Sequence, residues 1–167
     1  MLTKSSSHIS TPEAPASVTD VLSAANINAR TGLATDYLNH FNEFVMLLEL
    51  VPSLPDVRDD MLSWVPVTYK QHFMQSGFRE RELAIQAYDL APPRYRQAFD
   101  ETISVLNSLV RTVQLNLQDE AGPQDDIQIL AAQIRSLIAR AGAIVNGGIS
   151  FTTTSEAAQD AIDILFD

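Results

Sequence analysis

The chain of 167 residues contains no cysteine. Without thiols it can form no disulfide, no thiolate nucleophile and no cysteine-ligated zinc or iron–sulfur site. A metal would need histidine and carboxylate ligands, and the chain has only 3 histidines. The serines also lack the Gly-x-Ser-x-Gly setting of a hydrolase nucleophile. The sequence therefore predicts no cofactor, and it favours a protein without enzymatic activity.

Basic residues are scarce as well. The chain has 11 Lys and Arg against 21 Asp and Glu, which gives a net charge of −10. Binding to nucleic acid or to an anionic membrane surface depends on clustered cations. Neither partner is expected, and we expect a protein partner instead.

Long hydrophobic runs are missing too. Residues 1–16 lack the run of about seven apolar residues that a secretory signal requires. No stretch reaches the roughly 18 uncharged apolar residues of a membrane span. We therefore expect a cytoplasmic protein with a flexible tail over residues 1–16, where Ser, Thr, Pro and Ala dominate. Residues 17–148 are predicted to form a single helical domain, followed by an extended linker and a terminal amphipathic helix over residues 149–167.

The stretch from Thr31 to Val51 is the most apolar segment with helical spacing, and it predicts a central buried helix. Its buried stripe follows the i, i+3/i+4, i+7 pattern and consists of Ala34, Tyr37, Leu38, Phe41, Phe44, Val45 and Leu48. Thr31 or Thr35 is expected to cap this helix, and Pro52 ends it. Behind the stripe lie Met46, Leu47 and Leu50, so the second half of the helix is expected to be covered on more than one side.

Four short helices are predicted from caps, prolines and apolar spacing. The first covers residues 18–25 after a cap at Ser17, and a second runs from Ser53 to about Trp64. A third follows the capping box of Thr68 and Gln71 and ends near Gly77. A fourth helix begins after Ser76 and ends before Pro92 and Pro93. The packing positions of the second and the fourth are Leu54, Val57, Met61, Leu62, Leu83, Ala84, Ala87, Tyr88 and Leu90, and Trp64 is also expected in the core.

The two longest predicted helices come next. Residues 93–118 carry an apolar seam close to heptad spacing, Tyr95, Phe99, Thr102, Leu106, Leu109, Val113 and Leu117. Residues 127–145 carry a matching one, and Asp125 or Asp126 caps it. The polar turn between them predicts an antiparallel hairpin. The fold class is therefore all-α, a helical bundle built on this hairpin, the central helix and short helices that fill one end. A seam of this length also makes a homodimer plausible.

Chemically capable side chains gather on one face of the central helix. Asp36, Asn39, His40 and Glu43 fall within one arc because residues three and four apart are neighbours on a helix. With His72 they could hold a metal or a small ligand. However, the paired Glu-x-x-His pattern of di-metal bundles does not occur. The alternative is structural, with Asp36 near the positive helix end and His40 bonded to Asp36 or Glu43.

Most of the positive charge lies in the middle third of the chain. Arg94 and Arg96 are in the first turn of a predicted helix, where a phosphate or carboxylate would be favoured. The alternative is local pairing, Arg96 with Asp100, and Arg79 or Arg81 with neighbouring acids.

The C-terminal stretch AQDAIDILFD has an acidic, amphipathic pattern. It resembles the short peptide by which flagellar motor switch proteins, and more loosely the CheZ-type chemotaxis phosphatase, dock on a phosphorylated receiver domain. The switch-protein pattern reads roughly Ser-Gln-Asp-Glu-Ile-Asp-Ala-Leu-Leu. The matching positions are Gln159, Asp160, Ile162, Asp163 and Leu165, whereas Phe166 replaces a leucine and Ala158 and Ala161 depart from Ser and Glu.

The resemblance implies a response-regulator receiver domain as partner, with Ile162, Leu165 and Phe166 as the apolar edge that enters its groove. The alternative is that the same edge packs on the chain's own bundle. A CheZ-like phosphatase would carry an Asp-x-x-x-Gln pair on a long helix, and that spacing is absent. Glu82 with Gln86 is the nearest pair. The sequence therefore favours an interaction or regulatory protein over a phosphatase.

Overall fold

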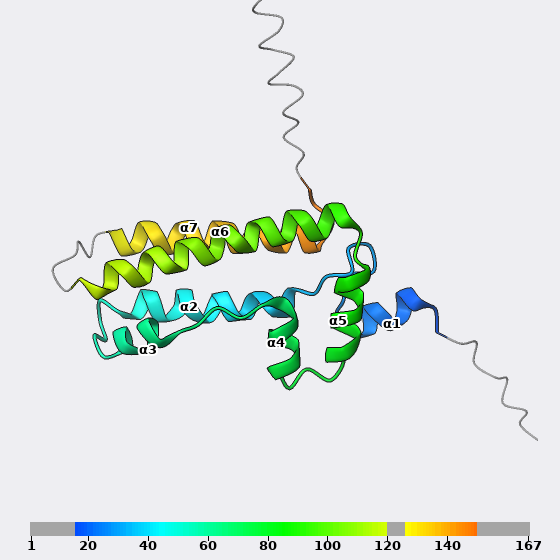
Figure 1. Cartoon of the computed structure of the whole chain (residues 1–167), viewed down its shortest axis with the longest axis horizontal. Coiled ribbons are helices and arrows are strands. Elements are labelled where there is room, and N and C mark those ends of the chain that lie inside the picture. Colours follow the sequence, from blue (N-terminus) through cyan, green and yellow to red (C-terminus); the bar gives the residue numbers. More distant parts are fainter. Residues whose placement is uncertain (1–15, 120–125, 150–167) are drawn as a thin grey trace, which may run out of the picture.

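The computed structural model describes residues 16–119 and 126–149, and within these ranges it is all-α, with no strand. The elements are α1 (Val18–Ala24), the 3-10 helix η1 (Thr35–Leu38), α2 (Asn39–Leu50), α3 (Val57–Ser63), α4 (Tyr69–Gln75), α5 (Arg81–Leu90), α6 (Pro93–Gln118) and α7 (Asp126–Val145). Three long helices, α2, α6 and α7, run side by side and give the molecule its elongated shape (Figure 1).

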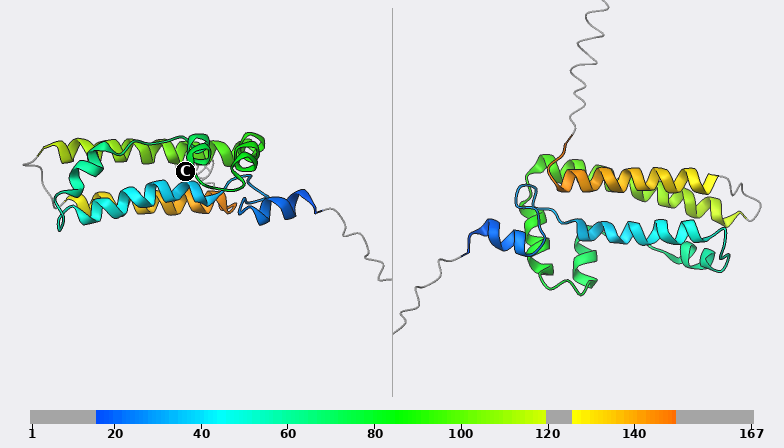
Figure 2. Two further views of the ribbon diagram at one scale, coloured as in Figure 1. Left: turned by 90° about the horizontal axis from the view of Figure 1, so that it is seen from below. Right: turned by 180° about the vertical axis from the view of Figure 1, so that it is seen from behind.

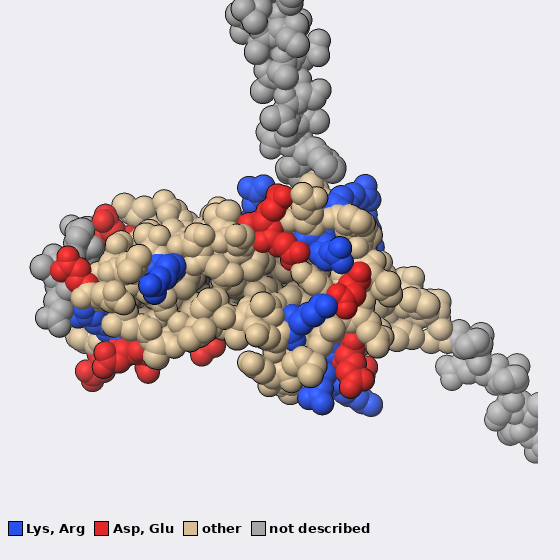
Figure 3. All heavy atoms as spheres, in the orientation of Figure 1, with Lys and Arg blue, Asp and Glu red and all other residues tan. Residues whose placement is uncertain are grey.

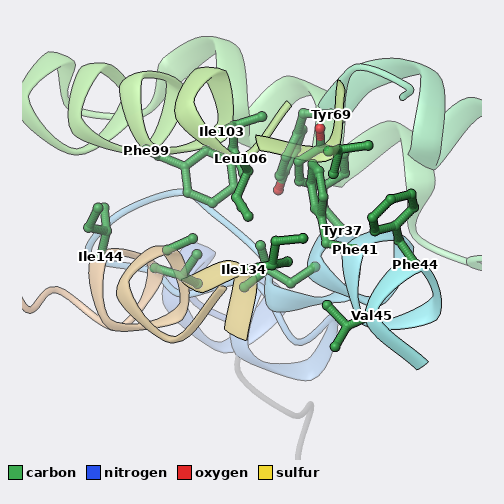
Figure 4. Packing of buried hydrophobic residues seen from close by; sticks show 14 of the residues in the cluster. Tyr37, Phe41, Phe44, Val45, Tyr69, Phe99, Ile103, Leu106, Ile134 and Ile144 are labelled. Carbon is green, nitrogen blue, oxygen red and sulfur yellow. The ribbon is translucent and has the colours of Figure 1, made fainter. Parts of the chain in front are cut away.

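The predicted hairpin of α6 and α7 is present. Both helices lie along each other in every view, and α2 packs on α7 (Figure 2). Every residue of the α6 seam except Leu109 is buried, and Leu109 packs partly buried against the core. Side chains of α2, α6 and α7 meet in one interior (Figure 4). Fully buried examples are Phe41, Phe99, Leu106 and Ile134.

A buried glutamine ties α3 to the hairpin. Gln114 Nε2 donates to the carbonyl oxygens of Met61, at 3.0 Å, and of Trp64, at 2.8 Å. Both acceptors lie at the end of α3, where a helix leaves its last carbonyls without internal partners. One side chain of α6 thus replaces two missing helix bonds and fixes the point where the chain leaves α3.

The central helix is shorter than predicted. Thr31 to Ala34 form no helix; η1 begins at Thr35, and the α-helix proper begins at Asn39. Neither threonine caps it, because the residue before η1 is Ala34 and no side chain bonds there. Thr31 Oγ1 instead donates to the carbonyl of Val145 at 2.7 Å. Gly32 lies between these residues at φ +70, a conformation that ends any helix started at Thr31.

The predicted burial of the central stripe is confirmed, whereas the predicted burial of the residues behind it is wrong for Met46 and Leu50. All seven stripe residues are buried. Met46 is 56% exposed and Leu50 is also exposed, so only Leu47 of the three packs against the core. Because α7 lies along one side of α2 and α3 beside its end, the opposite side stays open in the part of the chain that the structure describes.

Two packing positions on the short helices are also wrong. Leu54 precedes α3 and is exposed, and Leu90 at the end of α5 is 85% exposed. The short helices do not all fill one end: α3 lies near the hairpin turn, whereas α1, α4 and α5 lie toward the other end (Figure 1). α4 and α5 stand across the long helices.

The predicted cap at Ser17 and the predicted capping box at Thr68 are confirmed, and the structure shows a capping box at both positions. At α1 the Ser17 side chain accepts from the Asp20 amide and the Asp20 carboxylate accepts from the Ser17 amide. At α4 the Thr68 hydroxyl and the Gln71 side chain make the same exchange. These bonds satisfy amides that the first turn of a helix leaves free.

Among the described helices, α7 is long and apolar enough to cross a membrane by length and composition. A packed core helix passes the same test, so this evidence is weak. In the bundle α7 contacts both α6 and α2, and its Arg135 forms a two-pronged ion pair with Glu49 of α2, with a shortest distance of 2.6 Å.

Candidate functional site

The structure brings Asp36 and His72 together. Asp36 lies in η1 and His72 in α4, and Asp36 Oδ2 is 2.9 Å from His72 Nε2. Asn39 Nδ2 donates to the other carboxylate oxygen at 3.4 Å. The Tyr37 and His72 rings pack edge to face, with 5.5 Å between the ring centroids. The pair therefore links α4 to the start of α2.

His40 is held by a different set of contacts. Its Nε2 accepts from the amide of Val67 at 3.3 Å, and its ring stacks on Trp64 with 4.2 Å between centroids. The pKa of His40 is lowered to about 4, first by burial and then by the nearby His72, while a hydrogen bond with the Val65 backbone opposes both. The ring is therefore neutral at pH 7, with its Nε2 in use as an acceptor.

The metal version of the prediction receives no support. Glu43 is exposed on α2, and the His40 and His72 rings are 6.5 Å apart between centroids. Within residues 16–119 and 126–149, no three His, Cys, Asp or Glu side chains are placed to hold a metal ion. Asp36, His40 and His72 serve instead as contacts that join α2, α4 and the segment between α3 and α4.

That connecting segment, Trp64 to Thr68, is extended at both ends. Side chains from other elements hold it. The Val67 carbonyl accepts from the Tyr37 hydroxyl at 2.8 Å, while the Val67 amide donates to His40. The Trp64 carbonyl accepts from Gln114. Trp64 itself is half-buried among His40, Phe41 and Phe44 instead of being fully in the core.

The held segment forms one wall of a groove whose other wall is α6. This α6 groove has a volume of about 770 Å³. Its apolar lining comprises Tyr37, Pro66, Val67, Tyr69, Phe99 and Ile103, and its polar lining comprises Thr68, Tyr88, Asp100, Ser104, Asn107, Ser108 and Arg111. Over the middle of α6, the face seen in Figure 3 carries few charges, whereas charged side chains gather toward its ends.

Opposite charges mark the two ends of the α6 groove. Near one end the Tyr88 hydroxyl donates to both oxygens of Asp100, at 2.8 and 2.9 Å. Burial, and then this hydrogen bond, raise the pKa of Tyr88 to about 12. Three helical turns along α6, Arg111 is exposed and makes no ion pair in the described part of the chain. The α6 groove can hold a small molecule whose apolar part lies along the groove and whose cationic group lies near Asp100.

Sequence reasoning missed this groove. The polar residues Asp100, Ser104, Asn107 and Arg111 recur at i, i+4, i+7 and i+11, so they form one row along α6. That row was a usable signal, since it runs beside an apolar seam. What the sequence did not indicate is that the segment before α4 lies opposite it.

Arg94 and Arg96 are both engaged. Arg94 donates to the Tyr95 hydroxyl at 3.3 Å and lies over that ring. Arg96 donates to the Asp89 carbonyl at 3.1 Å, and the predicted partner Asp100 binds Tyr88 instead. Arg79 does contact Glu80, at 3.7 Å, while Asp89 pairs with Lys70 at 2.6 Å. The arginines do not converge on one anion position.

The predicted docking residues, from Gln159 to Phe166, lie outside the described residues. No protein family, curated protein or solved structure matches this chain.

Proposed function

We propose that this chain is a non-enzymatic interaction protein that docks on the receiver domain of a response regulator through its C-terminal acidic segment. The observation that carries the proposal is the pattern of residues 159–166, which combines an apolar edge with flanking aspartates. An amphipathic helix of this kind enters an apolar groove of its partner, and the acids set its orientation.

The helical bundle supports the proposal because its chemically capable side chains have structural roles. His40 accepts from the Val67 amide and Asp36 bonds to His72, so these side chains hold elements of the fold together. The described core runs from Ala25 to Val145, so the bundle closes a large core before the docking segment begins. Gly147 then turns the chain at φ +87 just after α7. A folded bundle with a recognition segment after it suits an adaptor.

Binding to a receiver domain tests the proposal directly. The full chain should bind a receiver domain activated with beryllium fluoride more tightly than the unactivated domain, measured by isothermal titration calorimetry. Leu165→Asp should weaken binding at least tenfold, because it places a charge in the apolar contact and loses about 1.4 kcal/mol or more. Equal binding of the parent chain and of this variant would contradict the proposal.

Two of the positions that depart from the family pattern give a matched control. Ala158→Ser together with Ala161→Glu brings the segment closer to the pattern, so affinity should stay the same or increase. Far-UV circular dichroism of each variant should match the parent, since the changed residues follow the described core. A loss of helicity would show that the segment belongs to the core.

A small-ligand binding protein is the second candidate, and the α6 groove favours it. The groove joins an aromatic floor to a carboxylate at Asp100, and its size suits a small molecule. The net charge of −10 also attracts cations. The ligand class is an aromatic or aliphatic amine. This site differs from the location predicted at Asp36, His40, Glu43 and His72.

Phenethylamine is a suitable probe for the groove. In heteronuclear NMR titrations it should shift the amide signals of Ile103 and Asn107, and Asp100→Asn should weaken the effect several-fold by removing the carboxylate. 3-Phenylpropionate has a similar apolar body with the opposite charge, so it is the matched control and should bind more weakly. Absence of shifts at millimolar amine would exclude this candidate.

A further inference from the structure

A second pocket lies where η1 and the start of α2 meet α7. It has a volume of about 480 Å³, within the range of about 300–1,000 Å³ that is typical of small-molecule sites. Two loops complete its wall, with Asn26 after α1 and Phe78 before α5. We call it the amide pocket, because Asn26, Asn39 and Asn42 line it. It forms only when segments far apart in the sequence come together.

Amide and hydroxyl groups make up most of the polar lining of the amide pocket. Three of the chain's seven asparagines line it, together with Thr35 and Asp36. Asn39 and Asn42 lie three residues apart on α2 and are therefore neighbours on one face. Each carboxamide offers one acceptor oxygen and two N–H donors. The pocket can thus give and accept several hydrogen bonds with the same ligand.

Most of this hydrogen-bonding capacity is not used within the protein. In the part of the chain that the structure describes, the side chains of Asn26, Asn42 and Thr35 make no hydrogen bond. Asn39 makes one long bond, 3.4 Å from its Nδ2 to a carboxylate oxygen of Asp36. All four side chains are exposed to water. A ligand with several hydroxyl groups can replace this water without leaving a polar group unpaired.

The lining of the amide pocket favours an uncharged ligand. No Lys or Arg is among its described lining residues, so an anion meets no opposite charge there. Asp36 is the one charged side chain of this lining, and its Oδ2 lies 2.9 Å from His72 Nε2. Its other oxygen accepts from Asn39. Because both oxygens are engaged, a cation would have to compete with contacts that hold the fold.

Charged residues of both signs stand beside the lining residues in the sequence. Glu43 follows Asn42, and Arg79 follows Phe78. Both are exposed, and Arg79 contacts Glu80 at 3.7 Å. A charged ligand therefore meets no concentrated opposite charge at the rim of the pocket either.

The remaining lining is apolar. Phe78 is half-buried and packs on Phe73, with 5.3 Å between the ring centroids. Leu38 and Ile138 lie deeper, on the bundle side. A sugar ring has apolar C–H faces between its hydroxyl groups, and such a face packs well on an aromatic or aliphatic side chain. The mixture of amides and apolar side chains matches this chemistry.

We propose that the amide pocket binds a neutral polyhydroxyl ligand of the size of a monosaccharide. The ligand hydroxyls bond to the side chains of Asn26, Asn39, Asn42 and Thr35 in place of water, and the C–H face packs on Phe78. The amide pocket shares no lining residue with the α6 groove, and it does not involve the C-terminal segment. The inference therefore does not depend on the proposed function.

Heteronuclear NMR of the full chain tests the inference with four neutral sugars, D-glucose, D-galactose, D-mannose and D-ribose. Small ligands at open sites bind weakly, so a dissociation constant in the millimolar range is expected. At least one sugar should shift the side-chain amide signals of Asn39 and Asn42 and the backbone signal of Gly142, and the shifts should saturate. The signal of Ile103, in the α6 groove, should not move.

Asn42→Ala removes one carboxamide from the pocket and should weaken sugar binding several-fold. Asn116→Ala is the matched control, because Asn116 is also an exposed asparagine of a long helix but lies outside the pocket. It should leave binding unchanged. Far-UV circular dichroism should be the same for both variants, since neither side chain is buried.

Gly142→Ala tests the pocket from the α7 side. In the described part of the chain, the one atom outside α7 within 4 Å of a Cβ built on Gly142 is Leu38 Cδ1, at 3.7 Å, which is an ordinary contact. Alanine also favours the helix over glycine, so the melting temperature should stay the same or rise. The added methyl group takes room in the pocket and should weaken sugar binding several-fold. Weaker binding in a chain of unchanged stability cannot result from unfolding.

Three results would overturn the inference. The first is an absence of shifts with all four sugars at tens of millimolar, or equal shifts over the whole surface. The second is sugar binding that Asn42→Ala and Gly142→Ala both leave unchanged. The third comes from D-glucosamine and D-glucuronate, which carry opposite charges on a similar ring. Binding of either one more than tenfold tighter than that of every neutral sugar would show a site for ions.

Discussion

Replacing Gly32 by alanine should destabilise the protein by about 2 to 5 kcal/mol. Gly32 has a φ of +70, where an L-residue with a side chain is strained by roughly 1–2 kcal/mol. A Cβ atom at this position would also lie 2.7 Å from the carbonyl oxygen of Ala87 and 3.2 Å from the Cα of Ala91. Both neighbours are backbone atoms, so the α5 end must move to relieve the contact, which adds about 1–3 kcal/mol.

The melting temperature measures this effect, and Gly77→Ala is the matched control. No atom lies within 4 Å of a Cβ built on Gly77, so that variant should melt within a few degrees of the parent chain. Gly32→Ala should melt well below both, by roughly 2–4 °C for each kcal/mol lost. Equal melting temperatures for the two variants would mean that Thr31 to Ala34 do not pack against α5.

Acid should destabilise the protein through His40, mainly between pH 6.5 and pH 4. The pKa of His40 is lowered from 6.5 to about 4, first by burial and then by His72. Above pH 6.5 the ring is neutral in both states and has no effect. As the pH falls below 6.5, the unfolded chain binds a proton that the folded chain does not. This lowers the free energy of unfolding. The change levels off near pH 4, where the folded state also binds a proton.

The size of the acid effect follows from the shift. Two to three pKa units correspond to about 3 kcal/mol at full strength. Because the ring is only half-buried, solvent screening reduces this to roughly 1–2 kcal/mol. Urea unfolding at pH 7 and at pH 4.5 should show the difference. His40→Gln keeps an acceptor for the Val67 amide without a titrating ring and should flatten the pH dependence. An unchanged slope in this variant would assign the acid sensitivity to other groups.

Much of the fold follows from local signals in the sequence. The cap at Ser17, the capping box at Thr68, the proline at position 93 and the seam of α6 predict helices that the structure contains. Residues far apart in the chain caused the errors. The sequence around Thr31 predicts a helix start. The Thr31 hydroxyl instead bonds to Val145, which is 114 positions away, and the local sequence does not indicate this partner. Met46 and Leu90 have helical spacing, but spacing alone does not say whether another element covers them.

The candidate site was less predictable for the same reason. The face with Asp36 and His40 was found correctly, and so was the proximity of His72. The hydrogen-bond partner of His40 was not, because it is a backbone amide 27 positions away on an irregular segment. The α6 groove needs both α6 and that segment, so it exists only after folding. A single sequence indicates which side chains share a helix face, but it does not indicate which loop lies opposite.

The extended segment from Trp64 to Thr68 has a consequence for solubility. An exposed extended stretch with free amides and carbonyls can pair with a strand of another molecule and start aggregation. Here Tyr37 and His40 take both polar backbone groups of Val67, and Gln71 accepts from the Thr68 amide at 2.9 Å. Pro66 has no amide to offer. The side chains that hold this groove wall also leave it few free backbone amides and carbonyls. The protein can therefore expose Val65, which is 67% accessible, without offering an edge to which a strand of another molecule could pair.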